Sequence, residues 1–248
     1  RMLRKVAIVT GSSRGIGRGI VLALAEHGWD VVINYRGNRQ AAEETQQAVK
    51  ARQARSIVIQ GDVSKADDRE RLVHEVIEEF GCIDLLVNNA GVTTPVDHDD
   101  LDGLSDEWID RIFQINWRGS FACVRAFKDL LQAEDGGTIV NISSIAGTTG
   151  IGSNVAYCAS KAAIDSMTRS LGRALAPKIR VISVAPGWVL GEYAKRFDPA
   201  YLQQQVDLTP VGRLATPEDV ANSVWAIATT LTLMTGNIVP VDGGRPLS

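Results

Sequence analysis

The chain has 248 residues, of which 45% are hydrophobic and 22% charged, as in a globular protein large enough to bury a substantial core. Twenty-six basic and 29 acidic side chains give it a net charge of −3. Proteins that bind nucleic acid or an anionic membrane surface usually carry a basic excess, so the charge argues against both kinds of partner.

Cysteine, histidine and hydropathy patterns exclude further classes. The three cysteines form no C-x-x-C pair, which predicts reduced thiols in a cytoplasmic protein rather than a disulfide framework. The three histidines show no metal-ligand spacing, so no metal site is expected. No apolar run approaches the ~18 residues that a membrane-spanning helix needs.

Short apolar runs alternate with longer amphipathic segments along the whole chain. Strands are predicted at residues 6–10, 31–35, 56–60, 83–87, 138–143, 179–184 and 237–241, and helices at 15–28, 38–53, 66–80, 105–134, 154–176 and 217–230. The strands are continuously apolar, which is typical of a parallel sheet buried on both faces. The pattern predicts an α/β fold: one Rossmann domain over residues 1–248, with a doubly wound, mostly parallel sheet of about seven strands between helical layers.

The first predicted strand runs into a glycine-rich turn, Thr10-Gly11-Ser12-Ser13-Arg14-Gly15-Ile16-Gly17. Glycines let the backbone turn sharply and approach a ligand, and the following helix offers N–H groups to a pyrophosphate. The G-x-x-x-G-x-G spacing differs from the common G-x-G-x-x-G fingerprint, and a glycine turn alone also suits a plain turn. Its place after the first strand favours a dinucleotide site made by Gly11, Ser13, Arg14, Gly15, Ile16 and Gly17.

The end of the second predicted strand indicates the form of the cofactor. Enzymes that use NAD usually place an Asp or Glu on the ribose 2′-hydroxyl at this point, but residues 31–42 contain none. Tyr35 and Arg36 stand there instead, and Arg36 with Arg14 would suit the 2′-phosphate of NADP(H). Each arginine alone would equally suit a solvated surface charge. The combination predicts NADP(H) as the preferred cofactor, with NAD(H) as the alternative.

Two further strand ends face the same expected crevice. Asp62 and Val63 follow the third strand, where Asp62 could accept a hydrogen bond from the adenine amino group or could simply form a turn. Asn89, Ala90 and Gly91 follow the fourth strand. Small and amide side chains suit a ligand at the sheet edge, and they also suit a polar turn.

Three polar side chains predict the chemistry. Tyr157 and Lys161 are four residues apart near the start of a predicted helix, so they share one face. Free tyrosine titrates near pH ~10, and a neighbouring ammonium lowers that pKa, which would let the phenol exchange a proton with a substrate oxygen. Such a pair alone is also common on helix surfaces. Ser144, at the end of the fifth strand, could donate to the same oxygen and so strengthens the interpretation.

With these motifs in this order, the whole chain resembles the short-chain dehydrogenase/reductase family. The resemblance implies that Tyr157 is the proton donor in carbonyl reduction and that Ser144 orients the carbonyl. It implies that Lys161 holds the nicotinamide ribose and depresses the pKa of Tyr157. Asn116 would hold a water in a proton relay to Lys161, although alone it would also suit a hydrogen bond between helices.

The segment after the sixth strand is implied to line the nicotinamide, through Pro186, Gly187 and Val189. The threonine that the family often has shortly after Pro-Gly is missing, because residues 187–192 carry no hydroxyl there. Residues 187–210 are irregular enough to predict a substrate loop or lid. Within it, Trp188 would face substrate or pack the lid, and packing is favoured. The resemblance also implies a homotetramer.

The closest resemblance is to 3-oxoacyl-(acyl-carrier-protein) reductases, which predicts NADP(H)-dependent reduction of a 3-oxoacyl thioester or small ketone to a secondary alcohol. A carrier protein is acidic, yet residues 97–107 and 128–135 are themselves acid-rich, which weakens that partner. The alternatives are a sugar or polyol dehydrogenase of the same family, a non-catalytic NADP(H) sensor and a sugar-nucleotide epimerase. The intact acid/base set argues against a sensor, and epimerases tend to be longer.

Overall fold

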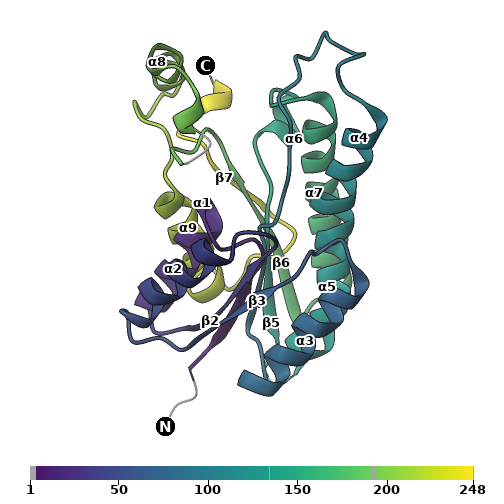
Figure 1. Cartoon of the computed structure of the whole chain (residues 1–248), viewed down its shortest axis with the longest axis vertical. Coiled ribbons are helices and arrows are strands. Elements are labelled where there is room, and N and C mark those ends of the chain that lie inside the picture. The colour runs from purple at the N-terminus through teal and green to yellow at the C-terminus, as the bar shows by residue number, and fades with distance from the viewer. Residues whose placement is uncertain (1–3, 134, 192–193, 248) are drawn as a thin grey trace.

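The computed structural model describes residues 4–133, 135–191 and 194–247, which form one parallel sheet between two helical layers (Figure 1). The described strands are β1 (Val6–Val9), β2 (Asp30–Tyr35), β3 (Ser56–Gln60), β4 (Leu85–Asn88), β5 (Gly137–Ile142), β6 (Ile179–Pro186) and β7 (Ile238–Val241). They are hydrogen-bonded in the order β3-β2-β1-β4-β5-β6-β7, and every neighbouring pair is parallel. The predicted doubly wound α/β fold is therefore confirmed.

Helices cover both faces of the sheet (Figure 1). One layer holds α1 (Gly15–Glu26), α2 (Arg39–Lys50) and α9 (Pro217–Thr229), and the other holds α3 (Ala66–Phe80), α5 (Ser120–Gln132) and α7 (Val155–Ala174). The short helices α4 (Asp106–Phe113) and α6 (Ala146–Thr149) pack beside α7. Helix α8 (Pro199–Asp207) lies near the C-terminus, in a separate projection of the molecule (Figure 1).

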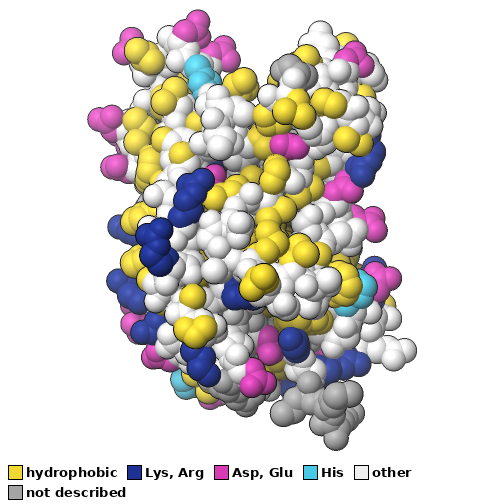
Figure 2. Space-filling model, turned by 180° about the vertical axis from the view of Figure 1, so that it is seen from behind, with side chains coloured by type: hydrophobic (Ala, Val, Ile, Leu, Met, Phe, Trp, Pro, Cys, Tyr) yellow, Lys and Arg dark blue, Asp and Glu magenta, His cyan; other side chains and the backbone are white. Residues whose placement is uncertain are grey.

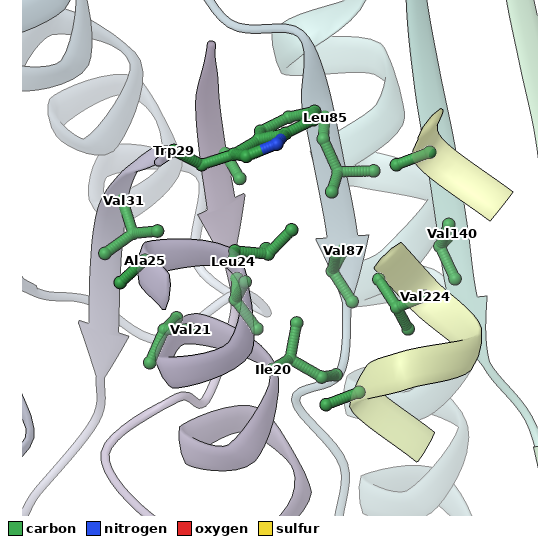
Figure 3. Close-up of a cluster of buried hydrophobic side chains, with 14 of the residues drawn as sticks. Ile20, Val21, Leu24, Ala25, Trp29, Val31, Leu85, Val87, Val140 and Val224 are labelled. Atoms are coloured by element: carbon green, nitrogen blue, oxygen red, sulfur yellow. The ribbon is translucent and has the colours of Figure 1, made fainter. Parts of the chain in front are cut away.

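Strand side chains fill both cores because successive residues of a strand point to opposite faces. Val9 packs in the core beneath α1, whereas Ile8 packs in the core beneath α3 and α5. Figure 3 shows the first core, where Ile20 and Leu24 of α1 lie beside Val87 of β4. Each such side chain contributes roughly 1.5–3 kcal/mol when fully buried, which explains the uninterrupted apolar strands.

The long helix predicted over residues 105–134 is present, but a π-helical turn divides it. The described part of this segment consists of α4, a π-helical turn (Gln114–Gly119) and α5. A π turn inserts one extra residue into the helical repeat and is frequent at functional sites. Asn116 lies inside it, and its side chain is hydrogen-bonded outside the helix.

The segment 187–210, predicted as a substrate loop or lid, contains a helix that the sequence analysis did not predict, α8. The Asp198 side chain caps this helix by accepting a hydrogen bond from the Ala200 N–H at 2.7 Å, and Pro199 occupies the first helical position. Both are ordinary helix-start signals. Residues 192 and 193 of the predicted lid lie outside the described residues.

Candidate active site

The strand order brings several loops to one edge of the sheet. β1 has β2 on one side and β4 on the other, so the chain reverses its winding between β1 and β4. In doubly wound sheets, ligands bind outside the carboxyl ends of the strands at such a switch point. The segments that follow β1 to β6 all leave the sheet at this edge, and they carry the predicted site residues.

The glycine turn between β1 and α1 is shaped for a close backbone approach. Gly11 and Gly15 have φ values of +64° and +57°, a region that side-chain-bearing residues rarely adopt. At Gly17, an added Cβ would lie 2.5 Å from Asn89 Nδ2, so only glycine fits against that amide. At Gly15, no atom lies within 4 Å of the position of a Cβ, which leaves the start of α1 open.

Two amide side chains fix this turn to its neighbours. Asn34 Oδ1 accepts a hydrogen bond from Gly11 N at 3.1 Å, and its Nδ2 donates to the Gly61 carbonyl at 3.1 Å. Asn89 Nδ2 donates to the carbonyls of Thr10 and Gly11 at 2.9 and 3.1 Å. Sequence reasoning assigned no role to Asn34; its signal was a polar residue inside an otherwise apolar strand, where a buried amide requires partners.

The remaining residues of the turn frame its outer side. Ser13 offers its carbonyl to the Thr45 hydroxyl at 3.0 Å, which ties the turn to α2. Arg14 is exposed and directly precedes α1. Ile16 is half-buried and packs against the hydrophobic core between α1 and the sheet.

The ends of β2 and β3 lie side by side, because Tyr35 pairs with Gln60 in the parallel register. Tyr35 is buried, and Arg36 is exposed directly after it. The Gln60 amide donates to the Arg36 carbonyl at 3.0 Å. A cation therefore stands at the end of β2, where NAD-dependent enzymes usually have a carboxylate.

Asp62 forms a turn after β3. Its Oδ1 accepts hydrogen bonds from Ser64 N at 2.9 Å and Ser64 Oγ at 2.7 Å. Burial acts to raise the pKa of this carboxyl, but the Ser64 bonds and the nearby charges of Arg36 and Lys65 lower it overall. Asp62 is therefore ionised at neutral pH. Its carboxylate is hydrogen-bonded within the turn, which is one of the two roles that the sequence left open. Val63 is buried beside it, against Gly119 of the π turn.

Tyr157 lies in the first turn of α7, in a half-buried position. Asn154 caps this helix: its Oδ1 accepts a hydrogen bond from Tyr157 N at 2.7 Å. Its Nδ2 donates to the Thr94 carbonyl at 2.7 Å and so ties the segment after β4 to the tyrosine. Sequence reasoning missed this role, although Asn is a favoured helix cap and Asn154 stands at the start of the predicted helix 154–176.

Lys161 lies one helical turn after Tyr157 and is buried. Its ammonium donates to the Ile142 carbonyl at 2.8 Å and lies 5.6 Å from the centre of the Tyr157 ring. Burial lowers the pKa of Lys161 to about 8, against the opposing effect of the Asp165 charge. The sheet edge therefore holds a buried cation beside a phenol.

Ser144 is half-buried and lies between β5 and α6, two residues before the helix begins. Its Oγ accepts a hydrogen bond from Ala146 N at 3.1 Å. A hydroxyl that accepts such a bond retains its own proton for donation. The next residue back, Ser143, donates from its hydroxyl to the Lys161 carbonyl at 3.3 Å, which links this strand end to α7.

Asn116 connects three parts of the site. Its Oδ1 accepts from Val92 N at 2.8 Å, and its Nδ2 donates to the Val92 carbonyl and to Ser160 Oγ, both at 3.1 Å. The hydrogen bond between helices, which the sequence left open as a role for Asn116, is therefore present. Its partner Ser160 directly precedes Lys161. Ala90 and Gly91 precede this contact, and Ala90 N donates to Thr10 Oγ1 at 3.0 Å.

The segment after β6 closes the far side of the site. Gly187 N donates to the Val241 carbonyl at 3.0 Å, and a Cβ on Gly187 would lie 3.0 Å from Asp242 Cα. Pro186 ends β6, and Val189 forms an isolated parallel bridge with Ala215. These contacts hold the start of the predicted lid against the end of β7.

Trp188 packs within the lid, as predicted. Its ring meets the rings of Phe197 and Tyr201 edge-on, with centroids 5.1 and 5.7 Å apart. Phe197 and Tyr201 stack on each other at 5.2 Å. Above the sheet edge, the surface is hollowed between the projection that carries α8 and the one that carries residues 92–105 (Figure 2), and hydrophobic side chains line part of this hollow.

Membrane-spanning helices and metal clusters are both absent from the described residues. None of their helices combines the length and hydropathy needed to cross a bilayer. No group of three or more His, Cys, Asp and Glu side chains in this part of the chain could hold a metal ion.

The chain shares its length and architecture with known proteins. Residues 11–245 match the family model described as enoyl-(acyl carrier protein) reductase. Over 244 residues the chain is 35% identical to the 3-oxoacyl-(acyl-carrier-protein) reductase FabG of Staphylococcus aureus, a match covering 98% of each chain. A crystal structure from Burkholderia xenovorans, described as a short-chain dehydrogenase/reductase, has a TM-score of 0.93, 32% identity and full coverage of both chains. A variant of a Serratia marcescens short-chain dehydrogenase/reductase has a TM-score of 0.89, 32% identity and 99% coverage of each chain.

Proposed function

Since this chain belongs to the short-chain dehydrogenase/reductase family, and is an NAD(P)-dependent oxidoreductase of alcohol and carbonyl groups, we propose that it uses NADPH to reduce a 3-oxoacyl thioester, or a comparable small ketone, to a secondary alcohol. One observation carries the proposal: Tyr157 and a buried Lys161 share a helix face, and the Lys161 ammonium is bonded to the end of β5, two residues before Ser144.

The residues around the glycine turn fit a nicotinamide dinucleotide. The open start of α1 at Gly15 offers backbone N–H groups to a pyrophosphate, and Gly17 keeps the turn tightly packed on Asn89. Asn89, Ala90 and Gly91 would bound the cofactor on the β4 side, and Pro186, Gly187 and Val189 would bound the nicotinamide. When bound, NADPH supplies the hydride that is added to the carbonyl carbon.

Side chains of the protein would supply the proton that the carbonyl oxygen receives. The Ser144 hydroxyl would donate to the carbonyl oxygen and orient it, and the Tyr157 hydroxyl would give that oxygen its proton. The Lys161 ammonium would stabilise the resulting phenolate and hold the nicotinamide ribose. Asn116 would hold a water that returns a proton towards Lys161.

The preference for NADPH is supported by charge. Arg14 and Arg36 are exposed beside the start of α1 and the end of β2, where the 2′-phosphate of the cofactor would lie. Guanidinium groups bind phosphates by paired, charge-assisted hydrogen bonds. Tyr35 at the end of β2, and the ionised Asp62 with Val63 after β3, would bound the adenine.

The substrate class is supported by the relatives, whose descriptions name reductases of acyl groups attached to carrier protein. The rim of this site is acidic, however. Asp97, Asp99, Asp100 and Asp102 are exposed in the segment that packs beside the start of α7, where Val96 N donates to the Ser153 carbonyl at 2.9 Å. Like charges disfavour docking of an acidic carrier protein, so we propose a thioester or ketone that arrives without one.

A binding and turnover experiment tests this function. NADPH and NADH are titrated by fluorescence against the wild-type chain, and a neutral 3-oxoacyl N-acetylcysteamine thioester is then offered with the preferred cofactor. We expect tighter binding of NADPH and consumption of NADPH with formation of the 3-hydroxyacyl product. Tight binding with no turnover of thioesters, simple ketones or sugars would favour the non-catalytic sensor instead.

A further inference from the structure

A buried carboxyl group lies on the same helix as Tyr157 and Lys161, and the mechanism above does not use it. Asp165 is one helical turn after Lys161 on α7, and only 3% of it is exposed. Its Oδ1 has no hydrogen-bond partner among the described residues. Buried polar atoms are almost always paired in folded proteins, so a carboxylate kept in this state requires an explanation.

The surroundings of Asp165 act on its charge in opposite directions, and burial has the largest effect. Burial raises the pKa of the carboxyl overall, and the hydroxyls of Ser143 and Ser183 and the charges of Arg169 and Lys161 oppose this rise. Ser183 Oγ lies 2.7 Å from Thr168 Oγ1.

This polar group continues through the interior towards the cofactor crevice. Asn141 Nδ2 donates to Thr168 Oγ1 at 2.9 Å, and Asn88 Nδ2 donates to Asn141 Oδ1 at 2.9 Å. Asn88 ends β4, directly before the segment that bounds the crevice. Within this row of buried polar side chains, Asp165 is the one acidic residue.

Lys161 is the buried cation that the Asp165 charge can reach. On α7 the other charged neighbour is Arg169, which is exposed. The facing strands present hydroxyl and amide groups, through Ser143 on β5 and Ser183 on β6. Arg180 of β6 points to the opposite face of the sheet, where it donates to the Ile227 carbonyl of α9 at 2.8 Å.

We propose that Asp165 is a positioning residue that keeps the Lys161 ammonium protonated inside the protein, and that it thereby sets the upper pH at which the site binds NADPH. The inference rests on the proposed function of Lys161. A unit charge one helical turn away shifts a buried pKa by about one unit or more, enough to decide whether Lys161 is charged at slightly alkaline pH.

The first test reads Lys161 directly and needs no cofactor. The apo protein is prepared with ¹³Cε-labelled lysine and titrated by NMR, and the Lys161 signal is identified by its absence from Lys161→Arg. Asp165→Asn should lower the pKa of Lys161 by about one unit, because a negative charge is removed. The matched control is Thr168→Val, which disrupts the same buried group without removing a charge and should leave that pKa unchanged.

The second measurement follows NADPH binding against pH in the same proteins. We expect the alkaline loss of binding to move about one pH unit lower in Asp165→Asn and to stay at the wild-type value in Thr168→Val. Should Asp165→Asn fail to fold, Asp165→Leu removes the same charge with an apolar side chain, a kind of replacement that buried sites often tolerate.

An unchanged Lys161 pKa in the charge-removing variant would overturn the inference, as would an equal shift in Thr168→Val. A lowered pKa without a matching change in NADPH binding would overturn the part that concerns the cofactor. If the wild-type chain bound neither nicotinamide cofactor, the proposed function would fail, while the NMR result would still decide whether the two charges are coupled.

Discussion

Lys161 is buried, and the proposed mechanism requires it as a cation. Burial lowers its pKa to about 8, well below that of a free lysine. The ammonium is therefore present at neutral pH and lost as the pH rises through about 8. Any function that depends on this charge should follow the same titration.

Binding of NADPH should accordingly weaken as the pH rises through about 8. The measurement is best made in Tyr157→Phe, because that variant removes the phenol as a second ionisable group. In Lys161→Arg with Tyr157→Phe, the guanidinium stays charged, so affinity should be lower overall but nearly independent of pH. An alkaline loss of the same size in both proteins would show that another group is responsible.

The two arginines at the predicted ribose end carry the second residue-scale prediction. Arg14→Ala combined with Arg36→Ala should weaken NADPH binding by about tenfold or more, since hydrogen bonds to charged groups contribute roughly 1.5–3 kcal/mol each. NADH, which lacks the 2′-phosphate, should bind almost as before. Parallel fluorescence titrations of both nucleotides decide the matter, and equal losses for the two would mean that the arginines do not read the phosphate.

At the scale of elements, the sequence predicted what local patterns encode. The continuously apolar strands and the turn from Gly11 to Gly17 follow from burial and backbone geometry, and both were predicted. The π turn around Asn116 was missed, because its cause is a set of hydrogen bonds to Val92 and Ser160, which are distant in the chain. Helix α8 was missed, although Asp198 and Pro199 are the cap and first-turn residues typical of a helix start.

The cap of α7 gives a prediction at this scale. Asn154→Ala should lower the free energy of unfolding by about 1 kcal/mol through loss of the cap. It should also reduce kcat, because the backbone N–H of Tyr157 loses its acceptor and the Thr94 carbonyl loses its hydrogen bond to α7. Urea unfolding and steady-state kinetics measure the two effects. Asn154→Asp is the matched control: it keeps the cap acceptor but not the donor to Thr94, so stability should recover more than kcat.

At the scale of the whole molecule, two projections flank the hollow above the sheet edge (Figure 2). One carries the acidic segment 97–107, and the other carries α8 and the aromatic group of Trp188, Phe197 and Tyr201. The sequence predicted the acidic segment and the lid position, but not that they face one hollow, since that follows only from the packing of the sheet edge.

The acidic rim should discriminate against an acidic carrier. One 3-oxoacyl group offered as its N-acetylcysteamine thioester should be reduced with a higher kcat/KM than the same group on acyl carrier protein. Asp99→Asn with Asp102→Asn should reduce the ratio of the two kcat/KM values several-fold, because like-charge repulsion slows association of the carrier protein. Glu70→Gln with Glu78→Gln, on α3, removes as much charge elsewhere and should change nothing. Faster reduction of the carrier-bound group by the wild type would contradict this view of the rim.

The central claim, that Tyr157 transfers the proton in a nicotinamide-dependent reduction, is tested most directly by comparing the wild type with Tyr157→Phe. NADPH affinity and the rate of thioester-dependent NADPH oxidation are measured on the same preparations. We predict that affinity changes by less than about threefold while the rate falls by about 10²-fold or more, since only the transferable proton is deleted. A variant that turns over at the wild-type rate would contradict the account.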